Sequence, residues 1–183
     1  IRIQLLSDRI NFELPERGLY MELEGLIFSE GEKPFRRNIL YCNKAYDEIS
    51  VPNSKVAEYS NHGYEISRPG KARTRMTKQK HHGKLWNHNV WSIFAKMGFE
   101  ELNEISRDST KFVLPGIHEI DIFAKAGETV ILVECKSKLS PGKKTIRSYL
   151  LEINGYKEKA IQFLKRTYGN RIEVAFGLAT ENY

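Results

Sequence analysis

Residues 117–138 read IHEIDIFAKAGETVILVECKSK, and this stretch predicts two paired strands joined by the turn AGE. The apolar run from Val130 to Val133 is typical of a strand that is buried on both faces. Side chains two residues apart point to the same face of a strand, so Glu134 and Lys136 should project together at its end. Cys135 should point to the opposite face.

These charged residues at the end of an apolar strand need compensation, because an unpaired buried charge costs several kcal/mol. Asp121, in the segment EIDIF, has apolar neighbours on both sides and lies on the preceding strand. Neighbouring strands are about 4.8 Å apart, so Asp121 and Glu134 could share one cation. Mg²⁺ is the natural candidate because it prefers hard oxygen ligands, and Mn²⁺ should be able to replace it. Lys136 would lie beside that metal.

Length and composition exclude several classes of protein. The 183 residues suit one domain or one domain with an extension, and 40% of them are hydrophobic. The two cysteines, Cys42 and Cys135, form neither a disulfide framework nor a zinc motif, and Cys135 is expected to be a small buried residue. No apolar run reaches the roughly 18 residues of a membrane span, and no signal peptide is visible. We expect a cytoplasmic protein, and the first residue, Ile1, suggests a fragment of a longer chain.

The order of predicted elements indicates an α/β domain over residues 81–183. From residue 84 onward the patterns predict a helix at 84–99, strands at 99–106, 118–125 and 129–136, a helix at 146–167 and a strand at 171–180. A strand that returns to its sheet through a helix makes a right-handed crossover, which gives three layers.

Residues 1–80 are expected to form a β-leaning extension. Candidate strands are 18–28 and 36–42, and the polar segment 61–84 is interpreted as a loop or linker.

The segment IDIFAKAGETVILVECKSK resembles the signature of the PD-(D/E)xK phosphodiesterases, the restriction-endonuclease-like superfamily, and Holliday junction resolvases and Mrr-type nucleases are nearest in character. That signature is an Asp, a spacer of about ten residues and then Glu-x-Lys, on a core ordered helix, three strands, helix, strand. The resemblance covers residues 84–183. It implies that Asp121, Glu134 and the backbone carbonyl of Cys135 hold the metal and that Lys136 is the catalytic lysine.

Two departures from the family pattern stand out. Ile120 replaces the proline that often precedes the aspartate, and Asn87 occupies the place in the first helix where members often carry a glutamate. Asn87 offers an oxygen without a charge, so it is only a candidate ligand. Glu119 points to the same strand face as Asp121, and it is either an extra ligand or a solvated strand residue. The alternative for Glu134 and Lys136 is a solvated ion pair without a catalytic role. Against it, this is the only Glu-x-Lys triplet in the chain.

The charge distribution favours a nucleic-acid partner. The chain has a formal net charge of +6, and no acidic residue occurs from Ser67 through Phe99 or from Lys136 to Arg147. A solvated basic face would explain one such run, but two runs that flank the site favour phosphate contacts. The proposed contacts are Arg68, Lys71, Arg73, Arg75, Lys78, Lys80, Lys84, Lys138, Lys143, Lys144 and Arg147.

The sequence therefore predicts a Mg²⁺-dependent DNA endonuclease in which water attacks the phosphodiester in line and Lys136 assists electrostatically. The alternative is a nucleic-acid-binding module on the same fold that has lost cleavage. A third interpretation is a structural domain of a larger restriction or repair assembly, and the chain could also form a homodimer.

Overall fold

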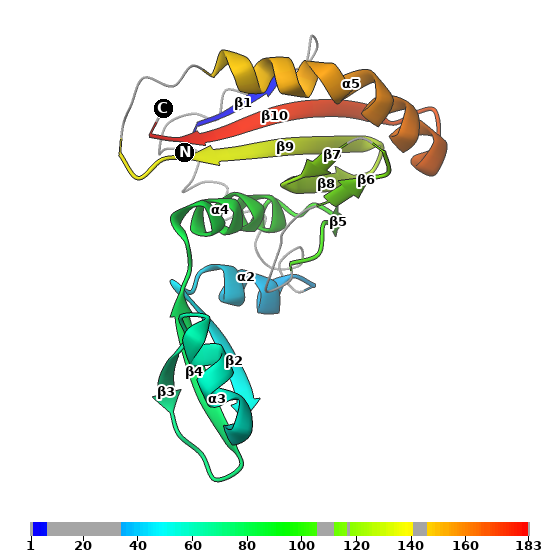
Figure 1. Cartoon of the computed structure of the whole chain (residues 1–183). Coiled ribbons are helices and arrows are strands. Elements are labelled where there is room, and N and C mark those ends of the chain that lie inside the picture. Colours follow the sequence, from blue (N-terminus) through cyan, green and yellow to red (C-terminus); the bar gives the residue numbers. More distant parts are fainter. Residues whose placement is uncertain (1, 7–33, 106–111, 117, 141–145, 183) are drawn as a thin grey trace.

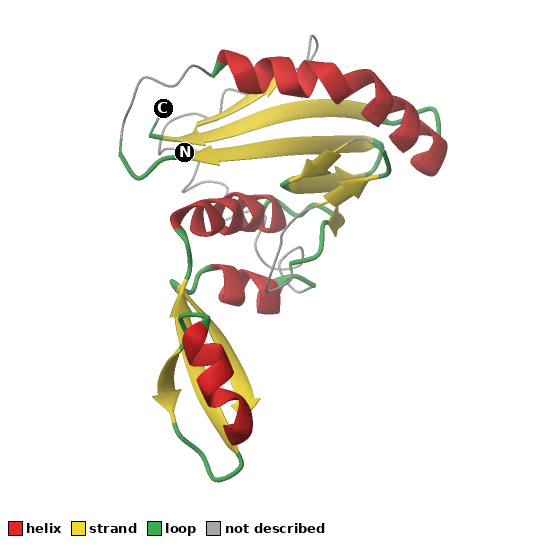
Figure 2. Ribbon diagram, viewed as in Figure 1, coloured by secondary structure: helices red, strands yellow, loops and turns green. Residues whose placement is uncertain are grey.

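A mixed α/β architecture is found in the computed structural model, which describes residues 2–6, 34–105, 112–116, 118–140 and 146–182 (Figures 1 and 2). The main sheet has five strands in the order β1-β10-β9-β8-β5. Their bounds are β1 Arg2–Leu6, β5 Glu101–Leu102, β8 Ile122–Ala126, β9 Thr129–Ser137 and β10 Glu173–Glu181. β9 runs parallel to β10 and antiparallel to β8, so it occupies the middle of the sheet.

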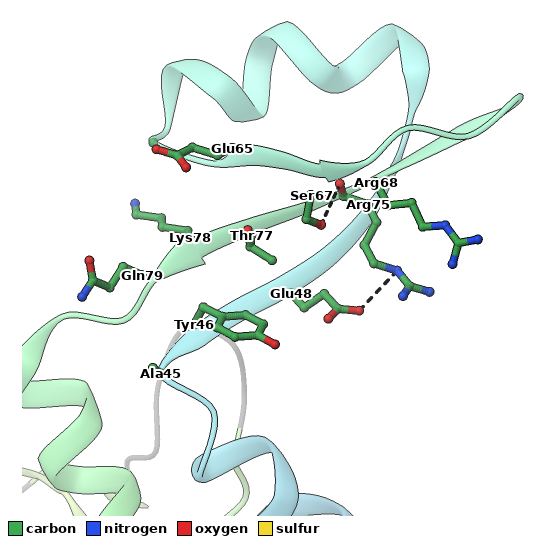
Figure 3. A pocket seen from close by; sticks show the side chains of 11 residues that line it. Ala45, Tyr46, Glu48, Glu65, Ser67, Arg68, Arg75, Thr77, Lys78 and Gln79 are labelled. Carbon is green, nitrogen blue, oxygen red and sulfur yellow. Dashed lines mark hydrogen bonds and ion pairs between the residues drawn. The ribbon is translucent and has the colours of Figure 1, made fainter.

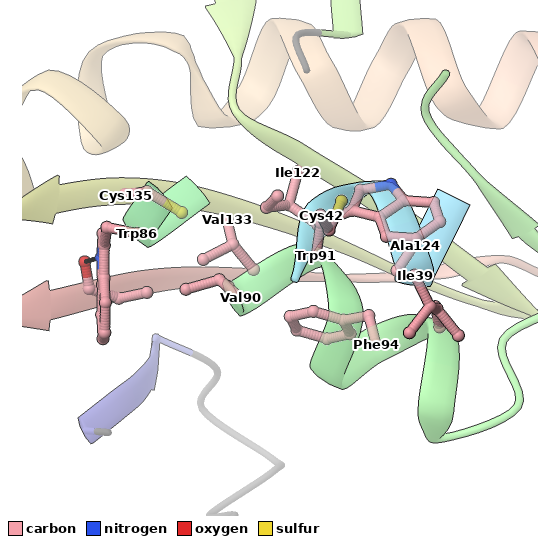
Figure 4. Close-up of a cluster of buried hydrophobic side chains, with 12 residues drawn as sticks. Ile39, Cys42, Trp86, Val90, Trp91, Phe94, Ile122, Ala124, Val133 and Cys135 are labelled. Atoms are coloured by element: carbon pink, nitrogen blue, oxygen red, sulfur yellow. Dashed lines mark hydrogen bonds between the residues drawn. The ribbon is translucent and has the colours of Figure 1, made fainter. Parts of the chain in front are cut away.

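Helix α4, His82–Lys96, covers one face of this sheet (Figure 4). Its side chains Val90 and Phe94 are buried with Val133 and Cys135 of β9. The helix begins where the His81 side chain accepts the Gly83 N–H, which satisfies one of the donors that a helix N-terminus leaves unpaired. It ends before Gly98, whose φ of 81° lies in the left-handed region that glycine adopts most easily.

Helix α5, Arg147–Tyr168, covers the opposite face. Ile153, Ala160 and Leu164 form the apolar stripe that packs on this face, where Leu132 of β9 is also buried. Gly169, with a φ of 102°, follows the last turn. The two helices and the strands β9 and β10 confirm the predicted elements. The strand predicted at 118–125 is divided at Asp121 into β7, which pairs with β6, and β8, which pairs with β9. Within the described residues, no helix combines the length and apolarity that a bilayer crossing requires.

The strand predicted at 99–106 is much shorter in the structure, where β5 contains only Glu101 and Leu102. The side chain of Asn103, the next residue, accepts a hydrogen bond from the backbone N–H of Phe123 in β8. A separate two-stranded ribbon of β6, Phe112–Leu114, and β7, His118–Ile120, precedes β8.

Residues 2–6 and 34–45 contribute more to the core than the sequence suggested. β1 pairs with β10 and extends the main sheet, so residues on both sides of position 80 contribute strands to it. The strand predicted at 36–42 is wrong, because Arg36–Cys42 forms helix α2. Ile39 and Cys42 are three residues apart and both buried against α4, which is helical rather than strand spacing. The predicted strand 18–28 lies outside the described residues.

Residues 46–79 form a small unit that projects from the main sheet, and we call it the arm (Figure 1). It consists of β2 Tyr46–Pro52, a 3₁₀ turn at Asn53–Lys55, α3 Val56–Asn61, β3 Glu65–Arg68 and β4 Arg73–Gln79, with the sheet order β2-β4-β3. The loop predicted at 61–84 is therefore wrong. Thr74 and Met76 are buried and alternate with the exposed Arg73 and Arg75, which is the period of a strand.

A buried lysine joins the arm to the core. Lys80 is 4% exposed, and its Nζ donates to the carbonyl oxygens of Tyr41 at 2.7 Å and Cys42 at 3.3 Å. The same nitrogen lies 3.1 Å from His88 Nδ1 on α4. A cation is stabilised at the C-terminal end of a helix, and here that helix is α2. Nearby, Lys84 forms an ion pair of 2.8 Å with Asp47 of β2.

His88 is neutral in this joint. Its side chain is fully buried, and burial, followed by the positive charge of Lys80, lowers its pKa from 6.5 to about 4. Its Nδ1 accepts a hydrogen bond from the Lys80 ammonium, which requires an unprotonated nitrogen. Protonation of His88 would therefore place two positive charges in contact inside the protein.

We expect His88 to make the folded protein sensitive to mild acid. Between pH 7 and pH 4 His88 becomes protonated in the unfolded chain but stays neutral in the folded chain, so the free energy of unfolding falls as the pH falls. At about 1.36 kcal/mol per pKa unit, a shift of about 2.5 units gives a loss of about 3 kcal/mol. Urea denaturation at a series of pH values measures this loss.

His88→Gln should flatten that pH dependence, whatever its effect on stability at pH 7. His62→Gln, at an exposed histidine on the arm, should leave it unchanged. Parallel curves for wild type and His88→Gln would contradict the role assigned to this residue.

Candidate active site

Asp121 sits at a break in the hairpin, between β7 and β8. The regular pairing of β8 with β9 reaches Ile122 opposite Val133 and then stops. The Asp121 carboxylate takes over as acceptor, because its Oδ2 receives the backbone N–H of Cys135 at 2.9 Å. The aspartate is 8% exposed, so its charge is held inside the protein by oriented donors rather than by water.

Asn87 of α4 is the second donor to this carboxylate, since its Nδ2 lies 3.0 Å from Asp121 Oδ1. The helix position singled out from the sequence is thus in direct contact with Asp121. Each carboxylate oxygen has two lone pairs, so these hydrogen bonds leave each oxygen able to accept a further partner.

Glu134 lies on β9 on the face covered by α5, and Cys135 is on the opposite face, as the strand alternation predicted for these two residues. It is 3% exposed, and its Oε2 is 3.4 Å from Lys136 Nζ. The hydroxyl of Tyr156, on α5, donates to Glu134 Oε1 at 3.4 Å. Burial, and next the Glu134 charge, raise the pKa of Tyr156, so its phenol keeps its proton and remains a donor.

Lys136 remains an ammonium in this environment. Burial alone would lower its pKa, but the carboxylates of Glu134 and Asp121 outweigh burial and raise the pKa above its ordinary value of 10.5. The nitrogen also lies 5.1 Å from the centroid of the Tyr149 ring on α5, at cation–π distance. A lysine in this state can stabilise negative charge but cannot accept a proton at neutral pH.

Asn103 holds the backbone of Asp121 in place, and sequence reasoning missed it. Its Nδ2 donates to the Asp121 carbonyl at 3.0 Å, and its Oδ1 accepts the Phe123 N–H at 3.0 Å. Its own carbonyl accepts from the Trp91 indole at 3.0 Å. Asn103 therefore ties β5, β8 and α4 together around the aspartate. A single asparagine after a weak strand carries no sequence signal for such a role.

Two other residues considered from the sequence are also located. The Cys135 thiol packs among the apolar side chains of the α4 face, as expected, and burial, then the charges of Asp121 and Glu134, raise its pKa. Glu119 is exposed on β7, opposite Val113 of β6, in the separate two-stranded ribbon. Its position favours the interpretation as a solvated strand residue.

The proposed phosphate contacts fall into distinct groups. Arg68, Lys71, Arg73, Arg75 and Lys78 are exposed on the arm, and Arg147 is exposed at the start of α5. Lys84 is paired with Asp47, Lys138 is half-buried, and Lys143 and Lys144 lie outside the described residues. Lys80 differs from all of these, because it is buried in the joint between arm and core. We therefore remove Lys80 from the proposed phosphate contacts.

The site holds two buried carboxylates and the Lys136 ammonium. Asp121 and Glu134 are both buried, and Lys136 is the cation that contacts Glu134. Two carboxylates beside one ammonium leave an excess of negative charge, which fits a hard divalent cation. In the described part of the chain, no cluster of three or more His, Cys, Asp or Glu side chains is arranged to hold a metal. A cation here would depend on these two carboxylates, backbone oxygen and solvent.

A comparison with protein families, curated proteins and solved structures found no match for this chain.

We expect Asn103→Asp to destabilise the protein by about 1–3 kcal/mol. The new side chain keeps the shape and the acceptor for the Phe123 N–H, but it loses the donor to the Asp121 carbonyl and adds a buried charge. Denaturant unfolding measures the change, with Asn154→Asp on the exposed face of α5 as the matched control. Equal stability of the two variants would show that Asn103 does not hold this strand.

Proposed function

We propose that this protein is a metal-dependent nuclease that hydrolyses phosphodiester bonds in DNA. The observation that carries the proposal is the pair of buried carboxylates, Asp121 and Glu134, held at one end of the hairpin with Lys136 beside them. Burying two carboxylates in one site is unfavourable unless cations compensate their charge.

The arrangement of elements supports a PD-(D/E)xK core. From residue 82 onward the main sheet and its helices follow the order α4, β5, β8, β9, α5, β10, with one helix on each face of the sheet. This is the order that the resemblance implies, and the β6-β7 ribbon is an insertion between its first and second strands. The Asp, Glu and Lys of the motif lie together in this arrangement.

Asp121 and Glu134 would hold the metal ion, with the Cys135 backbone carbonyl as a third ligand by resemblance. When bound, Mg²⁺ would supply Lewis-acid stabilisation of charge on the phosphate and lower the pKa of water. Asn87 and the Cys135 N–H orient the Asp121 carboxylate, and Tyr156 orients that of Glu134. Such fixed donors keep both carboxylates ready for binding without rearrangement.

Lys136 has an electrostatic role in this proposal. In the metal-free protein burial lowers its pKa, but the charges of Glu134 and Asp121 outweigh burial and raise it, so the side chain is an ammonium. Its ammonium can donate a hydrogen bond to a phosphate oxygen and stabilise the charge that develops during in-line attack. Glu134 and the Tyr149 ring fix its position.

A nucleic-acid-binding module that has lost cleavage is the second candidate. Asn87 favours it, because a neutral amide occupies the place where a carboxylate is frequent in the family and donates to Asp121. Fewer charges near the cation would weaken its binding. Calorimetric titration of the protein with Mg²⁺ and Mn²⁺ separates the two candidates, because only the nuclease requires a bound cation.

We expect wild type to cleave DNA with Mg²⁺ or Mn²⁺ and to be inactive with EDTA. Asp121→Asn, Glu134→Gln and Lys136→Met should each lower the cleavage rate by at least about 100-fold, because each removes charge that acts on the metal or the phosphate. The substrates to compare are supercoiled plasmid, linear duplex, single-stranded and branched DNA.

Lys125→Met is a matched control for these variants. Lys125 belongs to the same hairpin and also pairs with a glutamate, since its Nζ is 3.1 Å from Glu101 Oε1, but it lies at the opposite end of β8. This variant should cleave at the wild-type rate. Cleavage retained by Glu134→Gln, or cleavage by wild type in EDTA, would contradict the proposed chemistry.

Asn87→Asp should lower the Mg²⁺ concentration for half-maximal cleavage on the order of tenfold, or about 1.4 kcal/mol. The substitution keeps the size of the side chain and places a negative charge beside Asp121. Asn89→Asp adds the same charge to an exposed position two residues along α4 and is the control. Coincident Mg²⁺ titration curves for wild type and Asn87→Asp would mean that residue 87 does not influence the cation.

A further inference from the structure

The open face of the arm sheet is a surface whose residues the active site does not use. One face of the sheet is covered by α3, where Ile49, Val51 and Met76 form a small core. The side chains that alternate with this core point to the other face, and no helix of the described residues covers that face. A hollow of about 860 Å³ lies along that face, lined by residues of all three strands (Figure 3).

The strand register shows which side chains share this face. Tyr46 of β2 is opposite Gln79 of β4, and Ser50 is opposite Arg75. Thr77 lies between Glu48 of β2 and Glu65 of β3. The face thus presents hydroxyl, amide and guanidinium groups in adjacent rows, which are the groups that hydrogen-bond to phosphates and base edges.

The segment that carries β3, β4 and the turn between them is basic, and the face itself also holds the carboxylates of Glu48 and Glu65. Between residues 62 and 79 there are five basic residues, Arg68, Lys71, Arg73, Arg75 and Lys78, and one acidic residue, Glu65. Glu48 of β2 lies close enough to Arg75 for an ion pair, with 3.3 Å between Glu48 Oε1 and Arg75 Nε. A guanidinium has five N–H donors, so this contact still allows Arg75 to bind a phosphate. A polyanion complements such a face.

The dimensions of the face fit a B-form major groove. The two outer strands, β2 and β3, are each one strand spacing from β4, so they are about 10 Å apart. The major groove of B-DNA is about 12 Å wide, whereas the minor groove is about 6 Å wide. The seven residues of β4 span about 24 Å, or about seven base-pair steps of about 3.4 Å. The major groove of A-form RNA is too deep and narrow for side chains to read.

We propose that the open face of the arm binds the major groove of double-stranded DNA. Arg68, Lys71 and Arg75 contact phosphates, and Thr77 and Gln79 contact base edges. This inference deepens the proposed function, on which it rests, by naming duplex DNA as the substrate and the arm as its docking surface. The buried contacts of Lys80 fix the arm to the core, so DNA held by the arm has a defined position relative to the protein.

The phosphate contacts are tested through the salt dependence of binding. Affinity for a DNA duplex is measured from 50 to 300 mM salt in the presence of EDTA. EDTA removes divalent cations, so no cleavage occurs and binding is scored separately from catalysis. The triple variant Arg68→Gln, Lys71→Gln, Arg75→Gln should reduce the slope of log K against log salt by about 2 to 3, since each lost phosphate contact removes about 0.9. The triple variant Lys159→Gln, Lys165→Gln, Arg166→Gln on exposed positions of α5 makes the same charge change and should leave the slope at the wild-type value.

The base contacts are tested by selecting preferred duplexes from a random pool. The double variant Thr77→Val, Gln79→Ala should lose on the order of tenfold in affinity for the sequence that wild type prefers, with an unchanged salt slope. Equal slopes for the two triple variants would overturn the proposal. Equal affinity of wild type for double-stranded RNA or for polyglutamate would overturn it as well, because the occupant would then be another class of polyanion.

These outcomes differ from failure of the nuclease proposal. A chain that binds duplex DNA through the arm but never cleaves it supports the docking surface and contradicts the nuclease. If the protein cleaves DNA and the arm variants bind DNA with unchanged affinity, the nuclease is supported and the docking surface is contradicted.

Discussion

Strand β9 is buried on both faces, and this constraint shapes the rest of the molecule. It lies between β8 and β10 in the sheet and between α4 and α5 across the layers, so a polar side chain on it cannot reach bulk water without a gap in the packing. Glu134 is nevertheless on this strand and is 3% exposed. The surrounding structure supplies what water would otherwise provide, because the Lys136 ammonium and the Tyr156 hydroxyl both contact the Glu134 carboxylate.

The break at Asp121 has a similar origin. Where β8 departs from its ladder with β9, the Cys135 N–H would lose its partner, and a buried unpaired N–H is costly. The Asp121 carboxylate fills that role, and Asn103 holds the two backbone groups on either side of Ile122. One irregular residue therefore both satisfies the backbone and brings a second carboxylate to Glu134.

The joint at Lys80 gives the arm a defined relation to the core. The ammonium is surrounded by the end of α2 and by His88 of α4, so movement of the arm would break three contacts to one buried charge. Truncating one member of a buried charged network is strongly destabilising because its partners are left uncompensated. The acid sensitivity of His88 and the rigid presentation of the arm face follow from the same contacts.

The sequence by itself determined the central hairpin, both long helices with their glycine ends, and the convergence of Glu134 and Lys136. These depend on local periodicity and on residues close in the chain, so the pattern carries the information. The helix at Arg36–Cys42 and the strands β3 and β4 were misjudged, because segments this short fit more than one period. Asn103, Tyr156 and Lys80 gain their roles from partners between 18 and 39 residues away. Only the tertiary structure could assign them, because a hydrogen bond across that distance leaves no trace in a single sequence.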